Sequence, residues 1–298
     1  LVALEARTGR IVWHQQLVRH DLWDYDIPAQ PVLAHVTRDG RRVPAVIQAT
    51  KMGMLFVFHR ETGEPLFEIE ERPVPASDVP GEVAAKTQRF PVKPPPLVPH
   101  APLTPDDAYG LTFWDRGKCA EKFASYRSEG IYTPPSLRGT LMLPSYAGGT
   151  NWGGIAFDEG RGIAFANVNN VVAVVRLVPQ AEATRDLPGY TPQRGTPYAL
   201  SREIVTSPLG MPCNAPPWGT LAAVDMNAGT IKWQVPLGTT RDVAPWPWLE
   251  VGMPNFGGPI VTASGLLFIA ATTDNYLRAF EAETGKELWK GRLPAGGQ

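Results

Sequence analysis

The residues best suited to chemistry form one acidic and aromatic cluster near the N-terminus, His20-Asp21-Leu22-Trp23-Asp24-Tyr25-Asp26. Three carboxylates and a histidine within seven residues can accept protons or bind a cation. A solvated loop would have the same composition. The alternation of Trp23 and Tyr25 with the acids instead favours a partly buried rim, where one carboxylate could serve as a base or a metal ligand.

Lys51 is a second candidate, because it follows the strand-like run 43–49 and precedes Met52-Gly53. Most lysines are simply solvated. A lysine at a strand end beside an acidic loop could instead donate a hydrogen bond to a ligand oxygen, or pair with Asp24. The residues alone leave these alternatives open.

Asn167 is the third candidate. It begins the polar run Asn167-Val-Asn-Asn170, which closes a predicted hairpin that starts at Gly153-Gly154. Asparagines of this kind often serve only turn chemistry. The sequence contains no phosphate-binding loop, dinucleotide-binding glycine motif, serine-hydrolase elbow or zinc-protease motif, which argues against an ATP or nicotinamide enzyme.

The two cysteines, Cys119 and Cys213, lie far apart and lack the Cys/His spacing of a zinc site. They would either form one disulfide in an exported protein or remain two buried free thiols. With 28 basic and 29 acidic residues, the formal charge is -1, so nucleic acid is not an expected partner. No run approaches the roughly 20 apolar residues of a membrane helix.

A short sequence motif recurs along the chain and predicts the elements that must position these residues. An acidic residue precedes Thr-Gly or its equivalent, and an aromatic residue comes four positions after the glycine. Three copies end at Trp13, Trp233 and Trp289, and a weaker copy ends at Phe67. Short apolar runs flank each turn, which predicts β-hairpins whose glycine accepts a positive φ.

The spacing of these aromatic residues predicts the architecture. Trp13 and Phe67 are 54 residues apart, Trp233 and Trp289 are 56 apart, and the 166 residues from Phe67 to Trp233 would hold three such intervals. A period of roughly 55 residues in strand-rich units indicates an all-β β-propeller of about five blades, with the tryptophans packed between neighbouring blades. The 31 prolines and 29 glycines interrupt almost every stretch long enough for a good helix.

Two segments break the repeat: the proline-rich residues 70–110 and residues 176–200. We expect both to be long loop insertions that build one face of the scaffold, where a cofactor or partner can be covered. Residues 1–298 are therefore interpreted as one partial propeller domain.

Several longer motifs resemble a known family. They are His20-Asp-Leu-Trp-Asp-Tyr-Asp-Ile-Pro-Ala-Gln30, Glu129-Gly-Ile-Tyr-Thr-Pro-Pro135, Trp152-Gly-Gly154, Ser207-Pro-Leu-Gly-Met-Pro-Cys213 and the run from Gly257-Gly-Pro259 to Ala279. Spread over nearly the whole chain, they resemble the glucose, quinate and polyol branch of the dehydrogenases that use pyrroloquinoline quinone (PQQ). The resemblance implies an eight-bladed propeller with PQQ and Ca2+ or Mg2+ on its axis, of which this chain would cover about five blades.

The resemblance also implies roles for the three candidates. Asp24 matches the catalytic aspartate, Lys51 the lysine that contacts the quinone oxygens, and Asn167 an asparagine near the cofactor. Asp24 would remove the proton of a substrate hydroxyl while hydride moves to PQQ. Most cation ligands, and the residues that stack on the quinone, would lie in blades absent from this chain.

The implied function is oxidation of an alcohol group of a sugar or polyol, with glucose favoured over quinate, shikimate or glycerol and with ubiquinone as electron acceptor. The family places the propeller at the periplasmic face of the inner membrane, anchored by a segment absent from this chain. Arg19 stands where the family often has a second histidine, a departure that bears on the substrate. A non-catalytic propeller that scaffolds other proteins is the alternative, and a pairing of Asp24 with Lys51 would distinguish the enzyme from it.

Overall fold

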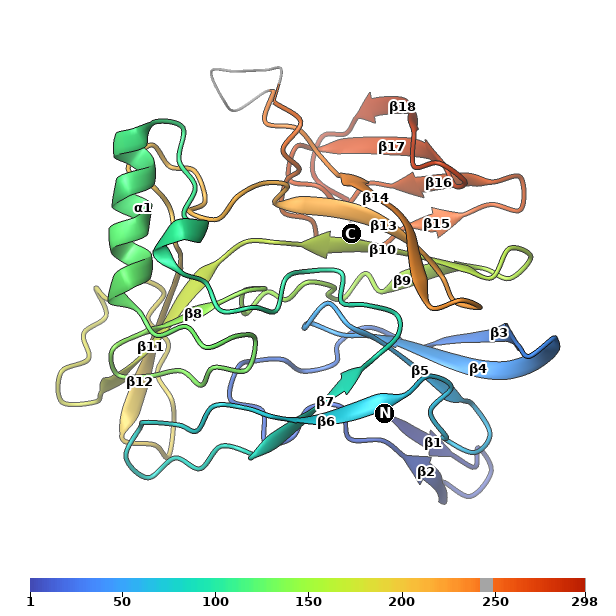
Figure 1. The fold of residues 1–298 in the computed structure, drawn as a ribbon, viewed down its shortest axis with the longest axis horizontal. Coiled ribbons are helices and arrows are strands. Elements are labelled where there is room, and N and C mark those ends of the chain that lie inside the picture. The colour runs from blue at the N-terminus through green and yellow to red at the C-terminus, as the bar shows by residue number, and fades with distance from the viewer. Residues whose placement is uncertain (242–248, 298) are drawn as a thin grey trace.

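The computed structural model describes residues 1–241 and 249–297, and its strands form six antiparallel sheets (Figure 1). Four sheets follow the sequence repeats: β1 (Val2–Leu4) and β2 (Ile11–His14); β3 (Val32–Arg38), β4 (Arg41–Ala49) and β5 (Leu55–His59); β9 (Ile155–Asp158), β10 (Ile163–Asn169), β13 (Gly219–Asp225) and β14 (Thr230–Pro236); and β15 (Ile260–Val261), β16 (Leu266–Ile269), β17 (Tyr276–Glu281) and β18 (Glu287–Arg292).

Two further sheets and two helical segments lie outside the repeats. They are β6 (Ile69–Pro73) with β7 (Thr87–Pro91); β8 (Thr140–Met142) with β11 (Ala173–Pro179) and β12 (Tyr198–Ile204); the 3-10 turn η1 (Pro105–Asp107); and helix α1 (Phe113–Ser125). Neither helical segment is long and apolar enough to cross a membrane, within the ranges that the structure describes.

The four repeat sheets are stacked as propeller blades, from β1–β2 to β15–β18 (Figure 1). The first strands of three of these sheets meet, because β3 contacts β9 and β9 contacts β15. One buried apolar cluster, including Ile47 and Ala166, fills the space between the β3–β5 sheet and its neighbour. A second, including Phe165 and Leu267, joins that neighbour to the β15–β18 sheet. The predicted all-β propeller architecture is confirmed.

Each copy of the motif that ends in tryptophan forms the same hairpin. The tryptophan always stands opposite an alanine, and the register shifts directly after that alanine. The pairs are Ala3 with Trp13, Ala223 with Trp233, and Ala279 with Trp289. The sequence repeat is therefore a structural repeat down to the strand register.

Trp13 and Trp233 pack across blade junctions, as predicted. A Cβ atom added to Gly63 would lie 2.7 Å from the Trp13 ring, and one added to Gly285 would lie 2.7 Å from the Trp233 ring. Both glycines have a positive φ, 75° and 74°. Each indole Nε1 also donates a hydrogen bond to a carbonyl of the next blade, at 3.0 and 3.1 Å.

Trp289 does not show the packing predicted for it. Its surface is 53% exposed, and no turn of a following blade lies against it among the described residues. The ring lies instead beside its own strand, where a Cβ atom added to Gly291 would lie 2.6 Å from it.

Phe67 and Trp233 mark neighbouring blades, although 166 residues separate them. A Cβ atom added to Gly229, in the turn before Trp233, would lie 2.7 Å from the Phe67 ring. The three intervals expected from the spacing are instead one blade together with the two extra sheets and α1. The number of residues between Phe67 and Trp233 therefore does not give the number of blades between them, because the inserted residues fold beside the stack.

The segments 70–110 and 176–200, expected to be loops, are loops only in part. The first includes β7, which pairs with β6. The second spans the end of β11 and the start of β12, with residues 180–197 between the two strands. Proline limits the length of these strands but leaves short runs at sheet edges free to pair.

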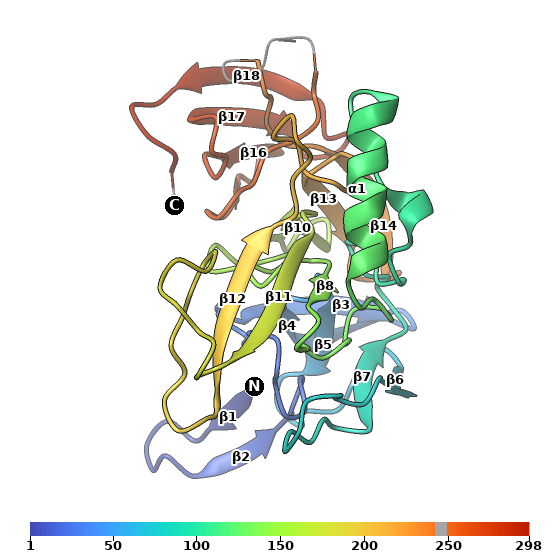
Figure 2. The same cartoon turned by 90° about the vertical axis from the view of Figure 1, so that its left-hand side faces the viewer.

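The sequence analysis did not predict α1. Thr112 caps its N-terminus by accepting a hydrogen bond from the Asp115 N–H at 3.1 Å. The helix lies beside the β8–β11–β12 sheet (Figure 2). Its Phe123 joins a buried apolar cluster with residues of that sheet. A disulfide joins Cys119 in α1 to Cys213, so the two cysteines are not free thiols.

Candidate active site

The loop between β2 and β3 holds Asp24 in an uncommon backbone conformation, with φ at 65°. Asp21 stabilises this loop, because its Oδ1 accepts hydrogen bonds from the N–H groups of Trp23 (2.9 Å) and Tyr25 (3.1 Å). A positive φ at a residue other than glycine is strained and persists only when the surroundings enforce it. The position of Asp24 is therefore built into this part of the fold.

Two buried aromatic residues enforce that position from either side of Asp24. The Trp23 indole donates a hydrogen bond to the Thr133 carbonyl at 2.8 Å, and the Tyr25 hydroxyl donates one to the Pro144 carbonyl at 2.8 Å. The Asp24 side chain between them is 58% exposed. The alternation of acids and aromatic residues thus forms a partly buried rim, as predicted, and not a freely solvated loop.

Lys51 lies in the turn between β4 and β5, as its strand-end position predicted. Its side chain is only 7% exposed. The Nζ atom donates hydrogen bonds to the Asp24 carbonyl oxygen at 2.9 Å and to the Asp26 carboxylate, and it lies 3.6 Å from Asp24 Oδ2. The structure therefore brings Asp24 and Lys51 together, and Asp26 is the carboxylate directly bonded to the lysine.

A glycine pair closes over Lys51. A Cβ atom on Gly148, where φ is 79°, would lie 2.5 Å from Lys51 Cγ. The Gly149 N–H donates a hydrogen bond to the Lys51 carbonyl at 2.6 Å, and the Gly149 carbonyl accepts one from Asn169 at 2.8 Å. This backbone bridge links Lys51 to β10. A side chain at position 148 would displace the Lys51 side chain.

Asn167 lies in β10 and belongs to a separate buried cluster. Its Nδ2 donates a hydrogen bond to Asn255 Oδ1 at 2.7 Å, and Asn169 Nδ2 donates one to the Asn255 carbonyl at 2.8 Å. Both asparagines stand inside the strand, so turn chemistry does not explain them. Asn167 Oδ1 is buried without a hydrogen-bond partner. Sequence analysis missed Asn255, because nothing near it marks a partner 88 residues away.

Partial burial and four charged neighbours shift the pKa of the Asp24 carboxyl. Partial burial raises its pKa above the ordinary value. Lys51 opposes this shift, Asp26 adds to it, Arg202 opposes it and Asp21 adds to it. A carboxylate with a raised pKa is a better proton acceptor, which suits a general base.

A cleft of about 620 Å³ opens beside Asp24. It lies between the Asp24 loop and the β11–β12 hairpin with its connecting residues 180–197. Its walls include Asp21, Trp23, Asp24, Glu82, Tyr146, Val175, Leu177, Thr191, Gln193, Thr196, Tyr198 and Arg202. Sequence analysis expected the 176–200 insertion to cover a face but did not single out Tyr146 or Arg202, because no motif surrounds either residue.

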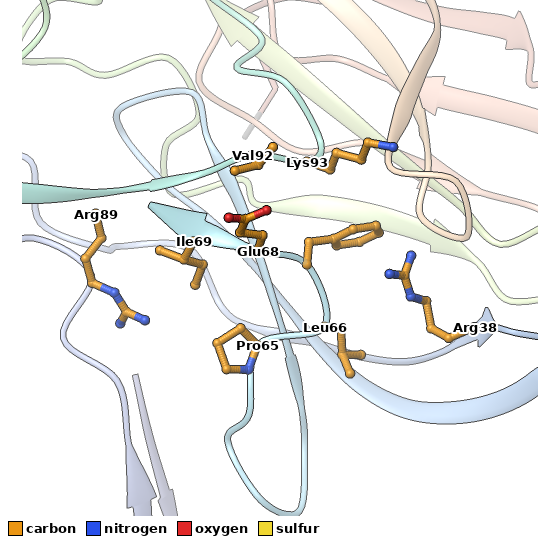
Figure 3. Close-up of a pocket in the computed structure, with 9 residues that line it drawn as sticks. Arg38, Pro65, Leu66, Glu68, Ile69, Arg89, Val92 and Lys93 are labelled. Carbon is orange, nitrogen blue, oxygen red and sulfur yellow. The ribbon is translucent and has the colours of Figure 1, made fainter. Parts of the chain in front are cut away.

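A second cavity, of about 470 Å³, lies at a blade junction (Figure 3). Arg38, Glu68, Arg89 and Lys93 surround it, and the Arg38 guanidinium stacks 4.3 Å from the centre of the Phe67 ring. It shares no lining residue with the cleft beside Asp24. Arg38 and Lys93 border the contact between the Phe67 ring and the Gly229 turn, so the cavity is part of that blade junction.

The described ranges contain no group of three or more His, Cys, Asp or Glu side chains placed to hold a metal ion. The sequence analysis left the metal ligands of this chain unassigned.

Comparison with known proteins places this geometry in context. The family model for the PQQ-dependent glucose/ethanol/alcohol dehydrogenase β-propeller domain matches residues 1–298. The chain is 41% identical to a quinoprotein glucose dehydrogenase of Escherichia coli (strain K12), covering 100% of this chain and 39% of the relative. It is 42% identical to a probable quinate dehydrogenase (quinone) of Xanthomonas campestris pv. juglandis, covering 100% of this chain and 40% of the relative.

Among solved structures, a europium-containing methanol dehydrogenase superposes with a TM-score of 0.62 at 21% identity, over 99% of this chain and 40% of the other, which shows the shared fold. The chain thus spans about two fifths of the length of its curated relatives. The matched domain, the repeated blade hairpins and the identity over the whole chain agree. The chain belongs to the family of PQQ-dependent dehydrogenase β-propellers.

Proposed function

We propose that this chain supplies the catalytic base and a cofactor-contacting lysine of a PQQ-dependent dehydrogenase that oxidises an alcohol group of a sugar or polyol, with glucose favoured. The observation that carries the proposal is the approach of the buried Lys51 ammonium to within 3.6 Å of the half-exposed Asp24 carboxylate. A scaffold propeller would need the tryptophan hairpins but not this pair, so the pairing favours the enzyme.

The residues present suit a quinone cofactor in three respects. Lys51 is a buried cation whose Nζ can donate to a quinone oxygen. Asn167 Oδ1 has no partner in its buried position, so it can accept a hydrogen bond from a bound group. Gly148 and Gly149 leave room beside the lysine where a side chain would collide.

The proposed chemistry divides between cofactor and protein. When bound, PQQ supplies the electrophilic carbonyl that accepts a hydride. Asp24 accepts the proton of the substrate hydroxyl, and its raised pKa favours that transfer. Lys51, oriented by Asp26, would hold the cofactor through a quinone oxygen, and Asn167 would contact it from β10.

The wider setting follows from the family and from one structural feature. Ca2+ or Mg2+ would accompany PQQ, and ubiquinone would accept the electrons. The Cys119–Cys213 disulfide suits an oxidising compartment, which supports a site at the periplasmic face of the inner membrane. The membrane anchor would belong to a segment outside this chain.

The test is Asp24→Asn in the full-length parent protein, reconstituted with PQQ and Ca2+ or Mg2+ and assayed with an artificial electron-accepting dye. Turnover of glucose should fall by at least about 1000-fold, because asparagine cannot accept the proton. Asp39→Asn is the matched control, since Asp39 is also an exposed aspartate with a positive φ, 50°, but lies in the β3–β4 turn.

Two results would contradict the proposal. Activity of Asp24→Asn within about tenfold of the parent would remove Asp24 from the reaction. A folded parent that oxidises none of glucose, quinate, shikimate and glycerol with PQQ would favour a scaffold instead.

A further inference from the structure

The cleft beside Asp24 contains one cation among its described lining residues, Arg202 on β12. Arg202 stands opposite Val175 in the β11–β12 register, so a sheet fixes its backbone. Its guanidinium carbon lies 4.4 Å from the centre of the Tyr146 ring, and its Nη1 lies 3.7 Å from Asp24 Oδ2. The guanidinium is thus held between an aromatic face and the carboxylate proposed as the base.

Two basic side chains approach the Asp24 carboxylate from different elements. Lys51 comes from the β4–β5 turn at 3.6 Å, and Arg202 comes from β12 at 3.7 Å. Lys51 is already bonded to Asp26 and to the backbone carbonyl of Asp24. Arg202 is therefore the second charged contact that limits where the Asp24 side chain can point.

The remainder of the cleft is acidic and polar. Asp21 and Glu82 add two carboxylates to that of Asp24, against the single guanidinium of Arg202. The connecting residues between β11 and β12 contribute hydroxyl and amide groups from Thr191, Gln193 and Thr196. Such a lining offers hydrogen bonds to hydroxyl groups and repels an additional negative charge.

We propose that Arg202 is a positioning residue for Asp24, and that the cleft they share binds an uncharged polyol in preference to a hydroxy acid. This inference rests on the proposed dehydrogenase function and narrows its substrate class. Arg202 could instead clamp a substrate carboxylate, but its guanidinium already faces Tyr146 and Asp24, and acidic groups dominate the surrounding walls.

The experiment compares glucose with quinate, a carboxylate, in the full-length PQQ-loaded protein and its Arg202→Gln, Arg202→Lys and Arg176→Gln variants. Arg176 is the matched control, because it lies on the same hairpin, is exposed and does not line the cleft. Thermal unfolding of each variant checks that the fold is retained.

The parent should use glucose at least about tenfold better than quinate, judged by kcat/KM. Arg202→Gln should lower kcat for glucose by about tenfold, with little change in KM, because it disturbs the base and not substrate binding. It should also move the acid limb of the pH profile upward, since Asp21 and Asp26 then act on Asp24 against Lys51 alone. Arg202→Lys keeps the charge and should restore the acid limb.

Three results would overturn the inference. If Arg202→Gln raises KM for quinate by roughly 100-fold and leaves glucose unchanged, Arg202 binds a substrate carboxylate. If the parent prefers quinate, the cleft does not select against charge. In both cases the dehydrogenase function stands. A folded parent that oxidises none of glucose, quinate, shikimate and glycerol with PQQ overturns the function and the inference together.

Discussion

The blade junction at Trp233 and the outer sheet at Trp289 contain the same hairpin in different surroundings. Trp233 lies against Gly285 of the next blade and donates a hydrogen bond to the Ala282 carbonyl at 3.1 Å. Trp289 has the same register partner type but is 53% exposed. The hairpin therefore forms from its own residues, whereas the packing of its tryptophan depends on a neighbouring sheet.

This difference separates two contributions to stability. Turn glycines and strand pairing are local, and all three tryptophan copies of the motif have them. Ring burial and the indole hydrogen bond need a second blade. Substitutions at the covered and uncovered tryptophans should therefore differ in cost, although the sequence around them is alike.

The largest effect is expected at the covered junction. Trp233→Ala should lower the free energy of unfolding by about 2 to 4 kcal/mol, because it removes a half-buried ring and leaves a carbonyl without its donor. Urea unfolding measures this change. A loss below about 1 kcal/mol would mean that the junction contact is not stabilising.

Two turn glycines, one facing a tryptophan ring and one not, test the same difference in packing. Gly63 and Gly9 hold equivalent turn positions with φ of 75° and 71°, but only Gly63 faces a tryptophan ring, and no heavy atom lies within 4 Å of a Cβ at Gly9. Gly9→Ala should cost about 1 kcal/mol from backbone strain alone. Gly63→Ala should cost about 2 to 3 kcal/mol, because the methyl group also displaces Trp13. Equal costs in urea unfolding would show that ring contact adds nothing.

The smallest effect is expected at the uncovered end. Trp289→Ala in residues 1–298 should lower the free energy of unfolding by about 1 kcal/mol, less than Trp233→Ala, because 53% of the Trp289 surface is exposed. The same substitution in the full-length parent provides the contrast. A loss there similar to that of Trp233→Ala would show that another blade covers Trp289, and an equal, large loss in both proteins would contradict the comparison.

Much of the fold could be predicted from local patterns. The Thr-Gly turns and flanking apolar runs predicted the hairpins, because turn conformation and strand alternation are local properties. The order of blades could not be predicted in the same way. Phe67 packs on Gly229 across a long insertion, and α1 begins at a capping threonine within a proline-rich chain, so neither follows from the repeat.

Some features of the candidate site were also predictable from local sequence, and others were not. The acidic cluster predicted a partly buried rim at Asp24, and the strand-end position predicted a constrained Lys51, both within 30 residues of each other. The contacts of Asp24 with Arg202 and of Asn167 with Asn255 could not be predicted. They join residues on separate sheets or loops, and no spacing along the chain records them.

Local sequence patterns predict the hairpins and the chemical types gathered in the 20–26 loop, because these depend on neighbouring residues. The tertiary structure alone decided which blades adjoin, that Cys119 meets Cys213, and that a guanidinium from β12 faces the Asp24 carboxylate. Such contacts depend on how inserted segments pack against the blades, and the free energy of that packing is shared among many distant residues.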